Sequence, residues 1–74
     1  MEHANEEVLV ERRGHVMLVT INRPKARNAV NVGVHMGLGL ALVEAEADPE
    51  IRCVIVTGAG DKAFCAGADL VALS

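Results

Sequence analysis

Aromatic residues are almost absent from this chain, which has one phenylalanine and no tryptophan or tyrosine among its 74 residues. We therefore expect no platform that stacks nucleic acid bases on aromatic rings. The net charge of −3 also argues against nucleic acid as the main partner. The two cysteines, Cys53 and Cys65, are too few to form a disulfide framework.

Long apolar runs are missing as well. Polar residues follow Met1, and no uncharged span approaches the roughly 20 apolar residues that cross a membrane. We expect a cytoplasmic protein with reduced thiols and no membrane partner. The three histidines have no metal-ligand spacing, so no metal is expected. Although 51% of the residues are hydrophobic, a chain this short buries only about 60% of its unfolded surface, which predicts marginal stability without partners.

The first part of the chain predicts a β-hairpin. Glu7–Arg13 contains the apolar run Val8 to Val10 and has charged residues at its end, and Val16–Asn22 is apolar and rich in β-branched residues. The short Gly14–His15 segment between them is a turn. Pro24 then ends the pattern and favours an extended backbone just before it.

Val32–Ala47 predicts a helix, with Asn31 as its N-cap. One helical row forms an apolar stripe that consists of Val32, Met36, Leu40, Val43 and Ala47. A second row contains the small residues Gly33, Gly37, Ala41 and Ala45. Because glycine inside a helix costs about 1 kcal/mol relative to alanine, we expect another element to approach closely across this second row.

Cys53–Thr57 predicts a further strand. Its uninterrupted apolar sequence is typical of a strand buried on both faces, with Cys53 in the core. A strand, a helix and a strand in this order predict a parallel pair and an α/β fold. Asp69 can then begin another helix, which would run towards Ser74.

Val56–Leu70 is the most informative stretch, because a strand leads into two small-residue turns before a helix start that can hold negative charge. Residues 58–63 also fit the G-x-G-x-x-A pattern of dinucleotide sites. That fingerprint needs a helix that opens directly at the turn. Here Gly67 interrupts the next turn, where that helix would have to run. The hypothesis that this is a nicotinamide-cofactor domain requires the chain to bind NAD, and a titration without binding would exclude it.

The basic residues Arg23, Lys25 and Arg27 gather around Pro24. Such a cluster is either a solvated loop or a phosphate contact, and the residues alone leave both open. Cys65 has no evident histidine and acid beside it in the sequence, so we interpret it as a buried small apolar residue.

Three blocks, Ile21–Val30, Val54–Gly60 and Lys62–Leu70, resemble the N-terminal part of the enoyl-CoA hydratase/isomerase (crotonase) family. The resemblance extends over residues 7–74. It implies an α/β fold of the ClpP/crotonase type, a spiral of ββα units. Residues 1–74 would then be the N-terminal fragment of one such domain, containing a β-hairpin, a helix, a strand and the start of the next helix.

The resemblance also implies a site. The backbone N–H of Ala68 would be one of two oxyanion-hole donors for a thioester oxygen. Lys25 and Arg27 would approach coenzyme A phosphates, and the small alanines would flank adenine and pantetheine, although ordinary tight packing also explains small residues. The full set of implied substrate contacts is Lys25, Ala26, Arg27, Ala29, Ala66, Gly67, Ala68, Asp69 and Leu70.

The function that the resemblance implies is syn hydration of trans-2-enoyl-CoA thioesters, as in fatty-acid β-oxidation. Coenzyme A would be part of the substrate, with no tightly bound cofactor, and the full-length protein would form homotrimers or hexamers. In the hydratases, two glutamates beyond the segment matched here do the acid and base chemistry, so we expect the 74 residues alone to be inactive. The alternatives are another acyl-CoA reaction of the family (isomerase, decarboxylase or hydrolase) or a non-catalytic, truncated assembly module.

Overall fold

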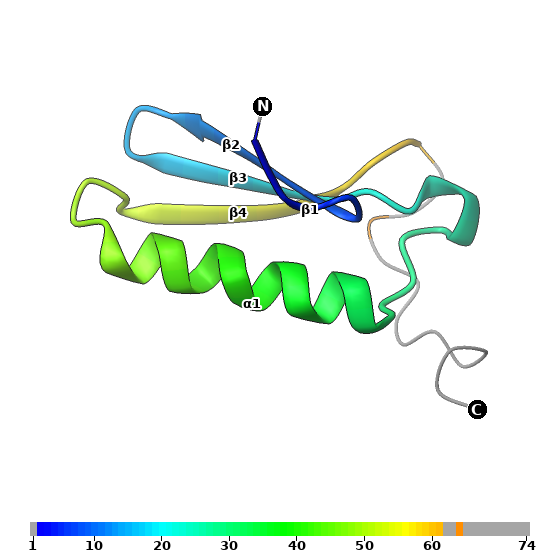
Figure 1. Cartoon of the computed structure of the whole chain (residues 1–74). Helices are drawn as coiled ribbons and strands as arrows, with labels where there is room; N and C mark the ends of the chain where they lie inside the picture. Colours follow the sequence, from blue (N-terminus) through cyan, green and yellow to red (C-terminus); the bar gives the residue numbers. More distant parts are fainter. Residues whose placement is uncertain (1, 62–63, 65–74) are drawn as a thin grey trace.

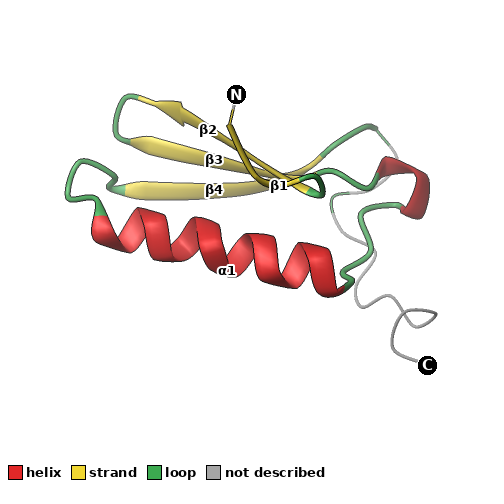
Figure 2. Cartoon of the chain, in the orientation of Figure 1, coloured by secondary structure: helices red, strands yellow, loops and turns green. Residues whose placement is uncertain are grey.

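A four-stranded sheet with one long helix along its face makes up the structure, a computed structural model that describes residues 2–61 and 64 (Figure 1). The strands lie in the order β1-β2-β3-β4. Figure 2 shows the helix running along the sheet, with a short 3-10 helix at one end. The elements are β1 (Glu2–Asn5), β2 (Val8–Arg13), β3 (Val16–Ile21), η1 (Pro24–Ala26), α1 (Val32–Ala47) and β4 (Cys53–Gly58).

The predicted hairpin is confirmed. β2 pairs antiparallel with β3 from Val8 opposite Ile21 to Arg13 opposite Val16, and Gly14 turns the chain with a φ of +60°. Each strand is one residue shorter than expected, because β2 begins after Glu7 and β3 ends before Asn22. These are ordinary differences at element ends.

β1 was not predicted from the sequence. It pairs antiparallel with the outer edge of β2, with Glu2 opposite Val10 and Asn5 opposite Val8. The segment is polar and shows no alternation of apolar residues. Backbone hydrogen bonding therefore holds it in the sheet, and no side-chain pattern indicates this pairing.

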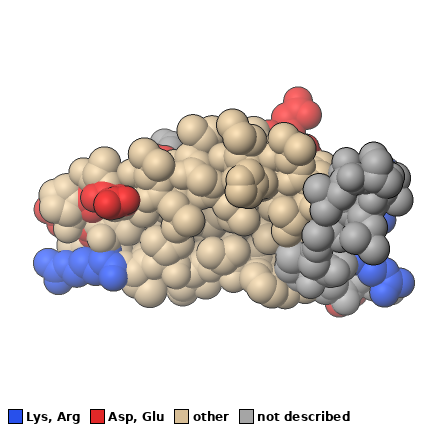
Figure 3. Space-filling model, turned by 90° about the horizontal axis from the view of Figure 1, so that it is seen from below, with Lys and Arg blue, Asp and Glu red and all other residues tan. Residues whose placement is uncertain are grey.

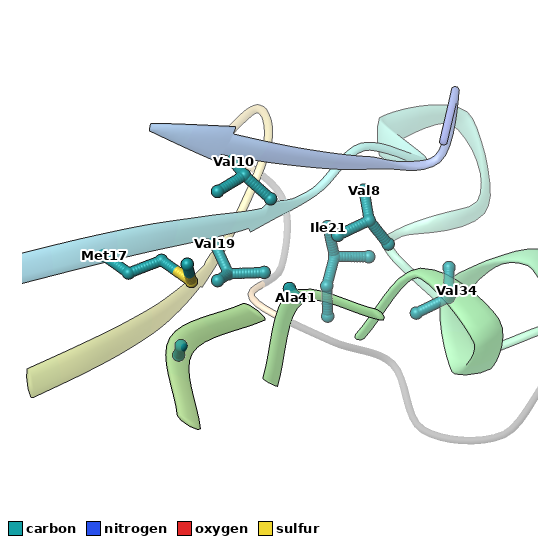
Figure 4. Packing of buried hydrophobic residues seen from close by; sticks show 8 residues of the cluster. Val8, Val10, Met17, Val19, Ile21, Val34 and Ala41 are labelled. Carbon is teal, nitrogen blue, oxygen red and sulfur yellow. The ribbon is translucent and has the colours of Figure 1, made fainter. Parts of the chain in front are cut away.

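The core lies between the β2-β3 hairpin and α1. Alternate residues of the two strands turn towards the helix, since successive strand side chains point to opposite faces. Figure 4 shows these side chains converging on Val34 and Ala41. The buried apolar residues are Val8, Val10, Met17, Val19, Ile21, Val34, Ala41 and Ala45.

α1 has the predicted bounds and the predicted cap: the side-chain oxygen of Asn31 accepts a hydrogen bond from the N–H of Val34 at 2.9 Å. The close approach at the small-residue row is also confirmed. A β-carbon built on Gly37 would lie 2.5 Å from Cγ2 of Val8. The helix therefore packs on the sheet through the small residues Gly37, Ala41 and Ala45 together with Val34.

The apolar stripe of α1 is not the face that packs on the sheet. Val32 is 69% exposed, Met36 56%, Leu40 55% and Val43 67%; Ala47 is exposed too. The small-residue row takes the position against the sheet because only small side chains allow the two backbones to approach so closely. The larger apolar side chains are left on the opposite face.

β4 pairs parallel with β3, from Val16 opposite Cys53 to Ile21 opposite Gly58, as predicted. The expectation that this strand is buried on both faces is wrong for the described part of the chain. Cys53 is exposed, not a core residue, and Ile55 is 48% exposed. The reason is geometric, because α1 packs on β1, β2 and β3 and leaves β4 at the edge of the sheet.

Polar contacts fix the C-terminal end of α1. Asp48 follows the helix; its carboxylate accepts a hydrogen bond from the N–H of Glu50 at 2.9 Å and pairs with Arg12 of β2. The backbone hydrogen bond from Glu50 lowers the pKa of the Asp48 carboxyl, and the Arg12 guanidinium lowers it further, whereas desolvation acts in the opposite direction. No helix in the described residues is long and apolar enough to cross a membrane.

Candidate functional site

The basic cluster lies in the connection between β3 and α1, which we call the 22–30 loop (residues 22–30). Pro24 occupies the first turn of η1, where the missing N–H costs nothing. Arg27 and Asn28 follow with positive φ values of 53° and 58°. The backbone N–H groups of Ala26 and Asn28 both donate to the carbonyl of Arg23, at 3.0 and 2.8 Å. The loop is therefore coiled by its own backbone hydrogen bonds.

Asn28 is fully buried and holds this loop from inside. Its side-chain oxygen accepts a hydrogen bond from the N–H of Arg23 at 2.9 Å, and its amide nitrogen donates to the carbonyl of Ala59 at 3.0 Å. Asparagine tolerates the left-handed backbone conformation better than most residues. Asn28 was not singled out from the sequence, where it lies between Arg27 and Ala29, three positions before the helix cap Asn31.

Glu7 ties the same loop to the sheet. Its carboxylate oxygen Oε2 lies 3.0 Å from Nε of Arg23 and accepts a hydrogen bond from the side-chain amide of Asn31 at 2.7 Å. Arg23 also donates to the carbonyl of Ala29 at 2.7 Å. Because Glu7 precedes β2 and Asn31 caps α1, this network joins the hairpin, the loop and the helix start.

An open hollow of about 450 Å³ lies beside the network. Half-buried Ala26 and exposed Lys25 are on its wall, so a cation stands at the edge of a concave surface. The lining residues are Glu7, Asn22, Arg23, Pro24, Lys25 and Ala26. A long anionic ligand could lie along this wall with a phosphate near the ammonium group.

The chain that leaves β4 passes close to the 22–30 loop. Ala59 donates its N–H to the carbonyl of Ile21 at 2.8 Å. A β-carbon on Gly60, whose φ is +81°, would lie 3.2 Å from Cβ of Pro24. No helix opens over residues 59–61, which form bends. The described backbone thus lacks the strand-to-helix turn of a dinucleotide fingerprint.

Four of the predicted site residues share one loop in the structure. Lys25 and Arg27 are exposed, while Ala26 and Ala29 are half-buried. The prediction that the two cations can reach an anionic ligand is compatible with this exposure. The remaining predicted residues lie outside the described part of the chain, as does Cys65: they are Ala66, Gly67, Ala68, Asp69 and Leu70.

A metal centre finds no support in residues 2–61 and 64. Within that part of the chain, no three side chains of His, Cys, Asp or Glu gather where they could hold a metal ion. The described features of the site are a loop coiled by its own backbone hydrogen bonds, two exposed cations and a hollow that one of these cations, Lys25, lines. They suit the binding of a phosphate-bearing ligand.

Comparison with known proteins extends the sequence resemblance. The family described as "Enoyl-CoA hydratase/isomerase" matches residues 16–74. Enoyl-CoA hydratase EchA19 of Mycobacterium tuberculosis is 52% identical over 66 residues, which are 89% of this chain and 24% of that protein. The mitochondrial 3-hydroxyisobutyryl-CoA hydrolase of Rattus norvegicus is 47% identical over 92% of this chain and 18% of that protein.

A solved structure shows the same arrangement of elements. EchA1_1 from Mycobacterium paratuberculosis superposes with a TM-score of 0.89 at 62% identity, over 93% of this chain and 27% of that one. The chain thus spans about a quarter or less of the length of these relatives.

Proposed function

Because the chain belongs to the enoyl-CoA hydratase/isomerase family and has the N-terminal part of its crotonase-like α/β fold, we propose that it supplies part of the active site of an acyl-CoA enzyme. The reaction proposed is syn addition of water to a trans-2-enoyl-CoA thioester. The water oxygen bonds to C3, and a proton is delivered to C2. Residues 1–74 are then the N-terminal part of a single domain.

The 22–30 loop carries the coenzyme A end of this proposal. Lys25 and Arg27 are exposed on a loop that Asn28 and Glu7 hold rigid, beside a hollow of about 450 Å³. A rigid loop presents its cations to the phosphates without losing much conformational freedom on binding. Half-buried Ala26 and Ala29 leave room for the adenine and pantetheine. This loop is the observation that carries the proposal.

The proposed oxyanion donor is the N–H of Ala68. A donor near a helix start adds the helix dipole to the hydrogen bond, and losing one such donor typically costs about 10²–10³ in rate. Gly67 would allow close approach of the thioester, Asp69 would cap the following helix, and Ala66 and Leu70 would complete the substrate contacts. No tightly bound cofactor is proposed, since coenzyme A is part of the substrate.

Acid and base groups are proposed to come from outside these 74 residues. Glu44 and Glu46 are exposed on α1, facing neither the hollow nor the 22–30 loop. The chain alone is therefore proposed to be inactive. A cytoplasmic location and a homotrimeric or hexameric assembly of the full-length protein, with no nucleic acid or membrane partner, belong to the same proposal.

Another reaction of the family is the main alternative, because one relative is named a 3-hydroxyisobutyryl-CoA hydrolase and matches at 47% identity. A non-catalytic assembly module is a second alternative. It draws on the large apolar face of α1, whose centre carries almost no charged side chains (Figure 3).

The test is to incubate the protein, in the form its host makes, with crotonyl-CoA and follow the loss of the conjugated enoyl absorbance. Hydration above the rate without enzyme supports the proposal. Release of free coenzyme A without hydration would favour the hydrolase. Coenzyme A binding with no reaction on enoyl, hydroxyacyl or β-ketoacyl thioesters would favour the assembly module.

A further inference from the structure

We propose that Asn28 is a positioning residue, which locks the coenzyme A loop to the segment that leads to the oxyanion donor; this inference rests on the proposed function. The 22–30 loop carries Lys25 and Arg27. The other segment leaves β4 through Ala59 and continues to Ala68, nine positions later (68 − 59 = 9). The side chain of Asn28 hydrogen-bonds to both segments.

The bonding pattern explains why an asparagine stands here. Its oxygen accepts from the N–H of Arg23 and its amide nitrogen donates to the carbonyl of Ala59. One side chain must therefore be both an acceptor and a donor, which aspartate is not when ionised. The side chain is fully buried, so a lost partner is not replaced by bulk water.

The peptide of Ala59 is held from both sides. Its N–H donates to Ile21 at the end of β3, and its carbonyl accepts from Asn28. The start of the outgoing segment is thereby fixed relative to the sheet and to the 22–30 loop at once. Close packing of Gly60 against Pro24 adds a second contact between the two segments.

Fixing these two segments relative to each other has a chemical consequence. Coenzyme A phosphates would be bound on one of them and the thioester oxygen on the other, so the distance between them must match the length of the substrate. Misplacement of reacting groups by about 1 Å can cost about 10²-fold in rate. Asn28 would therefore act on turnover through Ala59, without touching the substrate.

Two substitutions separate the two hydrogen bonds. Asn28→Asp keeps an oxygen that accepts from Arg23 but places a second oxygen against the carbonyl of Ala59, which repels it. Asn28→Gly removes both bonds while remaining compatible with the φ of +58°. Val10→Ala, in the core and away from both segments, is the matched control for a general loss of stability.

The experiment measures kcat and KM for crotonyl-CoA in the protein as its host makes it. We expect Asn28→Asp to lower kcat about tenfold or more with KM within about twofold, because only the oxyanion side is released. Asn28→Gly should lower kcat and also raise KM. Asn28 variants that match Val10→Ala in kcat and KM at an equal loss of Tm would overturn the inference.

Hydrogen exchange gives a readout that does not depend on turnover. The Arg23 amide should be protected in the wild type and in Asn28→Asp but exchange rapidly in Asn28→Gly. The Ala59 amide, which donates to Ile21 while its carbonyl accepts from Asn28, reports the lock between the two segments. It should be protected in the wild type and exchange faster in Asn28→Asp, and equal exchange in both would refute the lock. If the wild type hydrates no enoyl-CoA while the Ala59 amide behaves as expected, the proposed function fails and the lock stands.

Discussion

Gly37 of α1 and Val8 of β2 are in such close contact that a β-carbon on the glycine would lie 2.5 Å from a methyl carbon of the valine. Real β-carbons essentially never come so close to another atom. The contact is also enclosed on the side of β1, where the same β-carbon would lie 2.9 Å from the side-chain nitrogen of Asn5. The spacing between helix and sheet depends on this pair.

Gly37→Ala should therefore destabilise the fold, even though alanine favours a helix by about 1 kcal/mol over glycine. Overpacking of this kind costs about 1–3 kcal/mol. Gly39→Ala is the matched control, because a β-carbon on Gly39 meets nothing within 4 Å, and it should stabilise the chain by about 1 kcal/mol. Urea unfolding of the 74-residue chain measures both; equal effects of the two substitutions would contradict the close contact.

Asp48 makes stability depend on pH at the acidic end. Its pKa is lowered in the fold, first by the hydrogen bond from the N–H of Glu50 and also by Arg12. A lowered pKa means that the ionised form is favoured by folding, so the contribution is present above the unfolded value of about 3.9 and is lost as the pH falls through the folded pKa.

The difference in unfolding midpoint between wild type and Asp48→Asn should accordingly be constant above about pH 5 and shrink below about pH 4. Urea titrations at a series of pH values measure this difference. Raising the salt concentration should weaken the part due to Arg12, which is exposed, more than the part due to the backbone bond. A difference in unfolding midpoint that grows as the pH falls would contradict this prediction.

Ala68→Pro removes the proposed oxyanion donor. In the protein as its host makes it, kcat on crotonyl-CoA should fall about 10²–10³-fold, with coenzyme A still bound. Ala68→Gly keeps the N–H and should retain most of the activity. Steady-state assays measure turnover, and calorimetric titration measures the binding of coenzyme A. Unchanged turnover in Ala68→Pro would exclude Ala68 as the oxyanion donor.

Lys25→Ala should weaken binding of free coenzyme A about tenfold, because an exposed ammonium near a phosphate is lost. Raising the salt concentration should reduce the difference from wild type by screening. Arg52→Ala is the control, since Arg52 is an exposed cation that lies before β4, at the opposite end of that strand from Ala59. Calorimetric titration measures both variants; an equal loss in Arg52→Ala would mean that only net charge matters.

The exposed face of α1 should make the 74-residue chain associate with itself. Met36 and Val43 are each more than half exposed and lie beside a shallow hollow of about 250 Å³. Met36→Lys with Val43→Lys should yield a chain that sediments as a monomer. Gly39 and Leu40 lie between them, so Leu40→Met, which keeps the face apolar, is the control. A wild-type chain that is monomeric at high concentration would contradict this prediction.

Much of the fold could be predicted from the sequence because it depends on local patterns. The hairpin follows from two apolar runs around Gly14, and the start of α1 follows from the Asn31 cap. The face of α1 that packs on the sheet could also be predicted, because close backbone approach selects the small side chains of one helical row. The prediction that β4 is buried on both faces was wrong, because the burial of a strand depends on which elements cover it. The residues of the strand itself do not indicate those elements.

The residues of the candidate site also fall into those that the sequence could place and those that it could not. Lys25 and Ala26 could be placed on a loop, since Pro24 ends the strand pattern and the helix cap follows at Asn31. Asn28 was missed because its importance depends on a hydrogen bond to Ala59, 31 positions away. No periodicity in the sequence relates two such distant residues.

The contacts of Glu7 with the 22–30 loop have a consequence for the order of folding. Glu7 and Asn31 are 24 positions apart, and Asn28 and Ala59 are 31 apart, whereas the hairpin joins neighbouring strands through one turn. Long-range contacts carry the larger loop-closure entropy. The hairpin can therefore form early, and the 22–30 loop becomes ordered only when α1 and β4 have docked. A ligand bound by that loop would accordingly slow unfolding and leave the folding rate almost unchanged.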